Sequence, residues 1–250
     1  MSNFFRYNWE LHGQTARFLV DLDYAGKFDL MGDFITLIHV TCLPVDPSQP
    51  EFSRRERARL ETVAPRCMEI LGQSGAYVGA IDIGPQRKLY FYVSDARLLV
   101  PVFDLCSNEK GLTLTCARAD EPHRQTYYRL LMPDEAKKQS AANEAYIAEL
   151  RQRGDDTAAY RRINLHLRFP TIFAASAFLR EAKEAGFALG RDSYTPEQEL
   201  PHEATVHAVG RLLWNDVTAL TTRAIRLAEP YGGVLNSVDS AFVERRFSRA

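Results

Sequence analysis

The stretch from Arg161 to Val238 most constrains the fold, because its hydrophobic pattern switches between the periods of a strand and a helix. From Ile163 to Phe169 every second residue is apolar, which predicts a strand with one buried face. The pattern then predicts a helix from Thr171 to Gly186, strands over Phe187–Tyr194 and Ala204–Trp214, a helix from Asn215 through Glu229, and a short strand over Val234–Val238. The order is strand, helix, strand, strand, helix, strand.

The first half, from Asp33 to Arg118, shows the same order of elements. Trp9 and Phe18–Leu22 indicate one additional opening strand. The core elements are a strand over Asp33–Cys42, a helix from the capping box Ser53 and Glu56 to Gly72, a hairpin of Tyr77–Ile83 with Arg87–Val93, a helix from Asp95 through Cys106 that Pro101 should bend or shorten, and a strand over Leu112–Arg118.

Two split β-α-β units of this kind predict an α+β protein with two ferredoxin-like sandwiches, each with an antiparallel sheet and both helices on one face. Between them, Gln125–Met132 is interpreted as a strand or extended arm, and Pro133 opens a polar helix through Arg151. We therefore expect an N-terminal domain over residues 1–124, a polar helical connector over 125–156, and a C-terminal domain over 157–250.

Composition restricts the class of partner and the cellular compartment. The chain has 31 Lys and Arg against 32 Asp and Glu, so no overall field favours nucleic acid or a membrane. Met1–Glu10 lacks an apolar core of signal-peptide length, and no apolar run is long enough for a membrane span. These observations favour a cytoplasmic protein.

The spacing of the glycine, serine, histidine and cysteine residues matches no known catalytic or phosphate-binding motif. The glycines do not form a phosphate-binding loop, and there is no nucleophile elbow, zinc-binding helix or Cys-x-x-Cys pair. We interpret the four cysteines as buried structural thiols: Cys42, Cys67, Cys106 and Cys116. We interpret Asp21 and Asp23 as part of a solvated strand face in preference to a cation site. The sequence thus predicts no catalytic residue, no metal and no cofactor.

One face of the predicted C-terminal sheet carries the candidate binding residues. In a ferredoxin-like order the first and third strands are neighbours, so His166 and His207 should share the face opposite the helices. The residues expected beside them are Asn164, Arg168, Thr205 and Arg211. Trp214 and Tyr231 bracket the last helix, either as core anchors or as contacts.

Three uses of that polar surface remain open at this stage. It could pack against the first domain, whose His39 has the corresponding strand position, or dock another protein or a second copy of the chain. It could also bind RNA, although the stacking aromatics of an RNA recognition motif are missing.

The C-terminal half resembles the ribonuclease E inhibitor family of the regulator B type. The resemblance is carried by the strand Ile163–Phe169, by Ala182–Phe187 with its Gly186-Phe187 turn, and by Tyr231-Gly232-Gly233. The first half resembles an uncharacterised bacterial domain of unknown function that is often fused in front of that family. Its matching segments are Trp9, the strand Asp33–Cys42, and Gly79–Tyr92.

The resemblance implies a non-catalytic protein that binds an RNA-degrading endonuclease and restrains it. From sequence we therefore favour a cytoplasmic regulator or adaptor that acts by protein contact. The alternatives are an RNA-binding module that uses the His166 and Arg211 face, or an enzyme with a site between the domains. The oligomeric state is not predicted.

Overall fold

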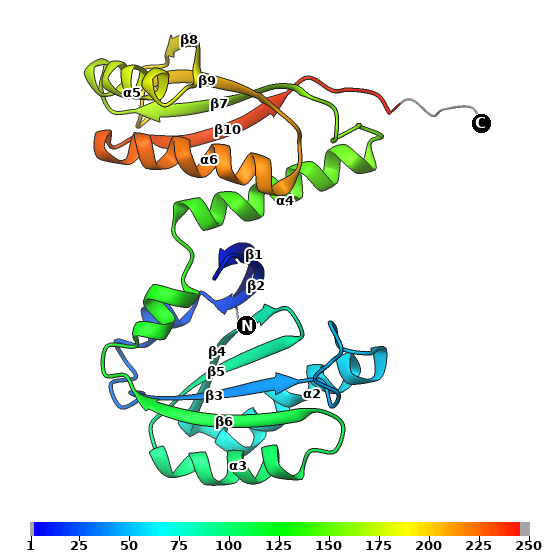
Figure 1. The fold of residues 1–250 in the computed structure, drawn as a ribbon. Coiled ribbons are helices and arrows are strands. Elements are labelled where there is room, and N and C mark those ends of the chain that lie inside the picture. Colours follow the sequence, from blue (N-terminus) through cyan, green and yellow to red (C-terminus); the bar gives the residue numbers. More distant parts are fainter. Residues whose placement is uncertain (1–2, 246–250) are drawn as a thin grey trace, which may run out of the picture. The chain divides into compact units, whose positions relative to one another are not determined.

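The computed structural model describes residues 3–245 (Figure 1). The chain forms two compact units, Met1–Pro133 and Asp134–Ala250. One antiparallel sheet lies in each unit, with six strands in the N-terminal unit and four in the C-terminal unit. The prediction of an α+β protein with two mixed units is confirmed.

The C-terminal sheet has the ferredoxin-like strand order β10-β7-β9-β8. The first and third strands of the unit, β7 and β9, are antiparallel neighbours, as predicted. The elements are β7 (Arg161–Phe169), α5 (Ile172–Glu184), β8 (Ala188–Tyr194), β9 (His202–Gly210), α6 (Trp214–Ala228), the short helix η4 (Glu229–Tyr231) and β10 (Val234–Ser240).

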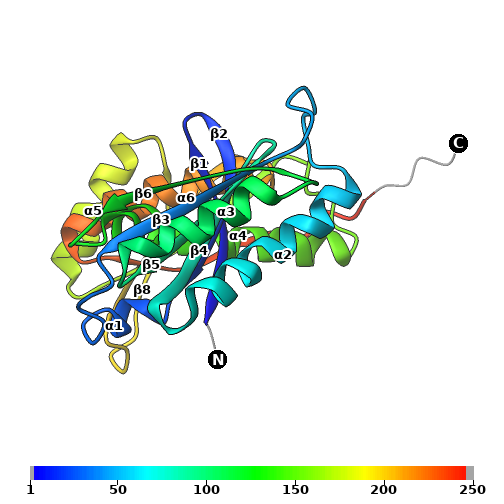
Figure 2. The same cartoon turned by 90° about the horizontal axis from the view of Figure 1, so that it is seen from below.

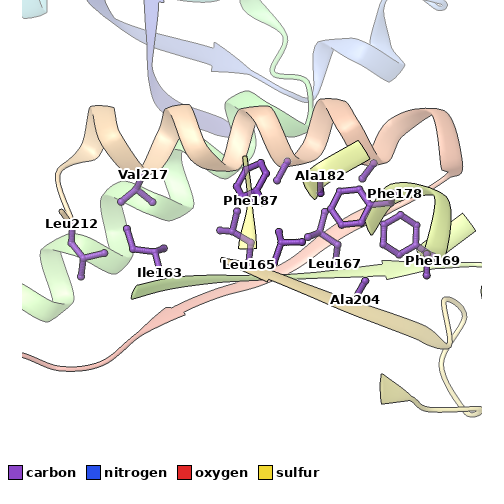
Figure 3. Close-up of a cluster of buried hydrophobic side chains, with 14 of the residues drawn as sticks. Ile163, Leu165, Leu167, Phe169, Phe178, Ala182, Phe187, Ala204, Leu212 and Val217 are labelled. Atoms are coloured by element: carbon purple, nitrogen blue, oxygen red, sulfur yellow. The ribbon is translucent and has the colours of Figure 1, made fainter. Parts of the chain in front are cut away.

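The core of the C-terminal unit lies between this sheet and its helices. The alternating apolar residues of β7 are all buried and pack with Phe178 of α5 and Val217 of α6. Figure 3 shows these side chains gathered between strands and helices. Burial of each large apolar side chain contributes about 1.5–3 kcal/mol. The Thr171 hydroxyl caps α5 by accepting a hydrogen bond from the Ala174 amide at 3.1 Å.

Helix α4 (Glu135–Gln152) is part of the C-terminal unit and packs against α6. The Asn143 amide donates to the Thr221 hydroxyl at 2.9 Å, and the Trp214 indole donates to the Ser140 hydroxyl at 3.2 Å. The buried side of α4 thus mixes polar and apolar residues, although the sequence suggested a connector on the surface. The predicted connector 125–156 is divided between the two units.

A buried ion pair joins the end of α4 to β7. The Arg161 guanidinium lies 2.7 Å from the Asp155 carboxylate, and the two side chains are 3% and 0% exposed. The same carboxylate oxygen accepts from the Val243 amide at 3.0 Å, and Arg161 also donates to the Ala241 carbonyl at 3.0 Å. Because both charges are removed from water, each depends on the other and on these backbone partners.

The N-terminal sheet has the order β1-β2-β4-β5-β3-β6, in which β4-β5-β3-β6 is the ferredoxin-like part. Helices α2 and α3 lie side by side on one face of it (Figure 2). The elements are β1 (Phe4–Leu11), β2 (Gln14–Asp21), α1 (Tyr24–Lys27), β3 (Thr36–Leu43), α2 (Arg54–Leu71), η1 (Gly72–Ser74), β4 (Gly75–Ile83), β5 (Gln86–Val93), η2 (Ala96–Leu98), α3 (Leu99–Asn108), β6 (Thr113–Asp120) and the π-helix η3 (Thr126–Leu131).

Two local predictions for the N-terminal unit were wrong, for the opening strand and for the segment 125–132, and one was confirmed in part. The single opening strand is a hairpin, β1 with β2, whose turn holds His12 at φ 52° and Gly13 at φ 75°. Helix α3 is shorter at its start than predicted, because residues 96–98 form η2 and the α-helix begins at Leu99; Pro101 lies in its first turn, where its missing N–H is not needed. The segment 125–132 is not a strand or arm, since most of it forms the π-helix η3.

The structure also shows how far the four cysteines and Asp21 are buried. Cys42, Cys67 and Cys106 are buried, as predicted, whereas Cys116 is partly exposed. Burial raises the pKa of the Cys42 thiol to about 12, so it stays protonated and unreactive at neutral pH. Asp21 is only 3% exposed, against the prediction of a solvated face, and accepts from the Asp23 amide at 3.1 Å.

Candidate functional site

The side of the C-terminal sheet that faces away from the α5 and α6 core is lined mainly by polar residues, and we call it the polar face. The strand register places His166 opposite Thr205 and Asn164 opposite both His207 and Asp239. The polar face consists of Arg162, Asn164, His166 and Arg168 of β7, Glu203, Thr205, His207 and Val209 of β9, and Asp239 of β10.

His166 lies at the centre of the polar face and joins three strands. Its Nε2 is 2.6 Å from an Asp239 carboxylate oxygen, and its Nδ1 is 3.0 Å from the Thr205 hydroxyl and 3.5 Å from the Glu203 carboxylate. Because a carboxylate only accepts hydrogen bonds, Nε2 must carry the proton toward Asp239. In the neutral imidazole, Nδ1 then accepts from Thr205.

The charged groups around His166 are largely paired with one another. The Asn164 amide donates to Asp239 at 2.7 Å, and the Arg168 guanidinium lies 3.4 Å from the Glu203 carboxylate. Partial burial opposes ionisation of Asp239, but the hydrogen bonds from Asn164 and His166 outweigh it and lower the pKa of this carboxyl. The polar face therefore carries both signs of charge in close alternation.

Two buried nitrogen atoms on the polar face have no hydrogen-bond partner among the described residues. They are Nδ1 of His207 and Nε of Arg168. Burial, followed by the charge of Arg162, lowers the pKa of His207, which keeps its imidazole neutral at neutral pH. An unsatisfied buried polar atom costs about 1–3 kcal/mol, so these two nitrogens oppose the stability of the folded unit.

The other three predicted residues lie elsewhere in the unit. Arg211 lies beyond the last residue of β9, 3.1 Å from Asp216 of α6, and so is not part of the polar face. Trp214 begins α6 and packs on the core. Tyr231 also packs against the core and donates its hydroxyl to Glu181 of α5. Both aromatic rings therefore support the folded unit.

Hydroxyl, imidazole and carboxylate follow one another from Thr205 through His166 to Asp239, an order also used in nucleophilic catalysis. The cavities of about 830, 400 and 290 Å³ are lined by other residues. Within residues 3–245, no three His, Cys, Asp or Glu side chains are placed to hold a metal ion. The arrangement suits a surface that makes contacts.

Sequence reasoning missed two of the acidic residues that organise the polar face. Asp239 was overlooked because the last strand was predicted to end at Val238, whereas β10 continues to Ser240. Glu203 was placed in the loop before the third strand, but β9 begins at His202. Extending the alternation by two residues at either strand end would have placed both carboxylates beside His166.

Part of the C-terminal unit is similar to a known protein family. Residues 140–236 match the family model described as Regulator of ribonuclease activity B. The match lies within the C-terminal unit and confirms the resemblance inferred from sequence for this part of the chain. It includes most of α4, which the structure likewise assigns to this unit.

No curated protein matches the chain significantly. A solved structure described as an unknown protein from Galdieria sulphuraria is similar at a TM-score of 0.21 and 8% identity, and the alignment covers 84% of this chain and 98% of that one. Among the described residues, no helix is long and apolar enough to cross a membrane.

Proposed function

We propose that this protein is a non-catalytic regulator that binds an RNA-degrading endonuclease in the cytoplasm and restrains it. The observation that carries the proposal is the match of residues 140–236 to a family of regulators of ribonuclease activity. The matched residues lie within the unit whose sheet carries the polar face.

The polar face is the contact surface in this proposal. It presents the network around His166 and the Arg168–Glu203 pair, with Val209, which is 72% exposed, as an apolar contact. Interfaces of this kind gain specificity from complementary charges more than from area.

The charges on the polar face favour a protein over RNA as the partner. RNA binding requires cations that are free to neutralise phosphates. Here the Arg168 guanidinium already pairs with the Glu203 carboxylate at 3.4 Å. The adjacent carboxylates of Glu203 and Asp239 would repel phosphates as well.

The test is a cleavage assay with purified ribonuclease E and a labelled single-stranded RNA. We expect the full-length protein to slow cleavage in proportion to its concentration and to co-elute with the endonuclease in size-exclusion chromatography. A gel shift of the RNA by this protein alone at low salt would instead indicate that it acts by sequestering RNA. Unchanged cleavage together with separate elution would sink the proposal.

The surface is tested with matched double variants. His166→Ala with Arg168→Ala removes two groups of the polar face, and we expect at least a ten-fold weaker effect on cleavage. Arg180→Ala with Lys183→Ala changes two exposed side chains of α5, outside the polar face, and serves as the control. Equal effects of both pairs would exclude the polar face as the contact surface.

A further inference from the structure

The hairpin of β1 and β2 extends the N-terminal sheet beyond its ferredoxin-like part. Across four strands the register aligns Asn8 with Arg17, Arg17 with Asp82, and Asp82 with Arg87. Arg87 is in turn opposite Cys42, which belongs to the core packed under α2 and α3. This polar row therefore lies on the helical face of the sheet, next to the helices.

The polar row forms the floor of a cavity of about 830 Å³. One wall is α2, through Arg57, Ala58, Leu60 and Glu61, and the loop before α2 adds Phe52. Small-molecule sites in proteins commonly measure roughly 300–1,000 Å³ and combine an apolar wall with a few placed polar groups. The cavity has the size and the mixed lining of such a site.

The strongest ion pairs in the cavity are centred on Arg87. Its guanidinium contacts both oxygens of the Asp82 carboxylate, at 2.5 and 2.9 Å, and lies 2.7 Å from Glu61. These contacts raise the pKa of Arg87, led by the hydrogen bonds to Asp82 and opposed in part by burial. Arg87 is thus engaged by protein carboxylates and fixes the floor of the cavity.

Among the described residues, one cation of the cavity lining has no ion-pair partner. Arg57 pairs with Glu51, the third carboxylate of the lining. Arg17 makes no ion pair with any residue that the structure describes, and it lies in the polar row next to Asn8. Every acid of the cavity is therefore paired with an arginine, whereas one guanidinium can still bind an anion.

We propose that this cavity binds a small organic acid, with the carboxylate on Arg17 and the apolar part against Phe52 and Leu60. A guanidinium binds a carboxylate through two parallel hydrogen bonds, which a neutral group of the same shape does not reproduce. The site belongs to the N-terminal unit and is separate from the polar face of the C-terminal unit.

The experiment uses the full-length protein and simple probes. Benzoate and phenylacetate are titrated in ligand-observed NMR beside benzamide and phenylacetamide, their neutral counterparts, and inorganic phosphate. We expect saturable binding of at least one acid and at least ten-fold weaker binding of its amide. Absence of saturable binding for both acids, equal binding of acid and amide, or binding of phosphate alone would overturn the proposal.

Four variants test whether the organic acid binds in this cavity. Arg17→Gln removes the unpaired charge, and Ala58→Phe fills the cavity from an exposed position of α2, so each should weaken binding of the acid about ten-fold or more. Arg17→Lys keeps the charge without the planar fork and should fall between Arg17→Gln and the unchanged protein.

Arg118→Gln is the matched control, because Arg118 is an exposed arginine of β6 outside the cavity lining. Circular dichroism checks that each variant is folded. If Arg118→Gln weakened binding as much as Arg17→Gln, or if both cavity variants bound the acid normally, the cavity would not be the site.

Discussion

The two units share a core order of elements but use the second face of the sheet differently. In the N-terminal unit this face is packed with aromatic rings, with Tyr7 stacked on Phe18 at 4.8 Å and Phe28 edge-on to Tyr127 at 5.1 Å. In the C-terminal unit the equivalent face carries the network around His166. The same topology therefore supports either a second hydrophobic layer or a polar surface.

The helices added to each ferredoxin-like core lie on different sides of its sheet. The N-terminal unit covers its second face with α1 and the π-helix, where the Tyr127 hydroxyl donates to the Asp21 carbonyl at 2.8 Å. The C-terminal unit instead adds α4 outside α6, on the helical side of its sheet. Thus the second face of the C-terminal sheet is not the packing surface for this added helix.

The largest expected effect comes from breaking the buried ion pair of the C-terminal unit. Arg161→Ala leaves the Asp155 carboxylate buried, with the Val243 amide as its one remaining hydrogen-bond partner among the described residues. We expect the free energy of unfolding of this unit to fall by about 3–5 kcal/mol. The chain has two tryptophans, one per unit, so Trp214 fluorescence in a Trp9→Phe background follows the C-terminal unit in urea.

The neighbouring exposed arginine gives the control for this experiment. Arg162→Ala should change the free energy of unfolding by less than about 0.5 kcal/mol. The comparison of the two units predicts that Trp9 fluorescence, measured in a Trp214→Phe background, reports an unchanged N-terminal transition with Arg161→Ala. A shift of both transitions by the same amount would show that the units unfold together.

The next effect concerns the covered face of the N-terminal unit. Tyr127→Phe removes the hydroxyl that satisfies the buried Asp21 carbonyl, and we expect a loss of about 1–2 kcal/mol in the Trp9-reported transition. Tyr128→Phe is the matched control, since the Tyr128 hydroxyl makes a longer and exposed hydrogen bond, to the Ala25 carbonyl at 3.3 Å. Similar losses for both variants would refute a special role for the buried hydroxyl.

Period and capping signals were sufficient to predict the strand and helix order of both cores. The predicted capping box is present, with the Glu56 amide donating to the Ser53 hydroxyl at 3.3 Å and the Ser53 amide donating to the Glu56 carboxylate at 2.8 Å. The alternation over Ile163–Phe169 likewise predicted which face of β7 is buried. These features depend on local sequence, so they can be read without knowledge of the tertiary structure.

The features that were missed depend on contacts distant in sequence. Helix α4 was predicted as a surface connector because its apolar stripe is sparse, but Ser140 and Asn143 are buried through hydrogen bonds to α6. The π-helix is held by long-range partners, including the Glu121 carboxylate that accepts from the Thr126 amide at 3.0 Å. A hydrophobic pattern does not reveal a polar side chain whose partner lies 70 or more residues away.

A smaller, pH-dependent effect is expected at Glu109 of the N-terminal unit. Arg66 and Arg59 lie 2.5 and 2.9 Å from its carboxylate, and their hydrogen bonds, led by Arg66, lower the pKa of Glu109. A lowered pKa means stability that is present above the unfolded value near 4.3 and is lost as pH falls through the folded value. Glu109→Gln should therefore cost about 1 kcal/mol at pH 7, because the arginines are partly exposed and water screens the pair.

The measurement is urea unfolding of the N-terminal unit at pH 7 and at pH 3, followed by Trp9. The difference between Glu109→Gln and the unchanged protein should shrink as pH falls, because the carboxyl becomes protonated in both folded and unfolded chains. Glu69→Gln, at an exposed position of α2, is the control. A difference that grows toward pH 3 would contradict the assigned direction of the pKa shift.

The smallest expected effect on stability lies on the polar face, at Asp239. Its pKa is lowered, so its contribution is also present above the unfolded value near 3.9 and is lost as pH falls through the folded value. The Asp239 side chain is 56% exposed, and we expect Asp239→Asn to cost only a few tenths of a kcal/mol at pH 7 in the Trp214-reported transition.

The size of the change in unfolding free energy with Asp239→Asn decides whether the polar face serves partner contact or the fold. If the polar face is maintained for contact with a partner, Asp239→Asn should weaken the restraint of ribonuclease E several-fold while unfolding hardly changes, because the charge acts across the interface. If Asp239→Asn destabilised its unit as much as Glu109→Gln destabilises the other, the network around His166 would instead hold β10 to β7. The polar face would then serve the fold, as the aromatic face does in the N-terminal unit.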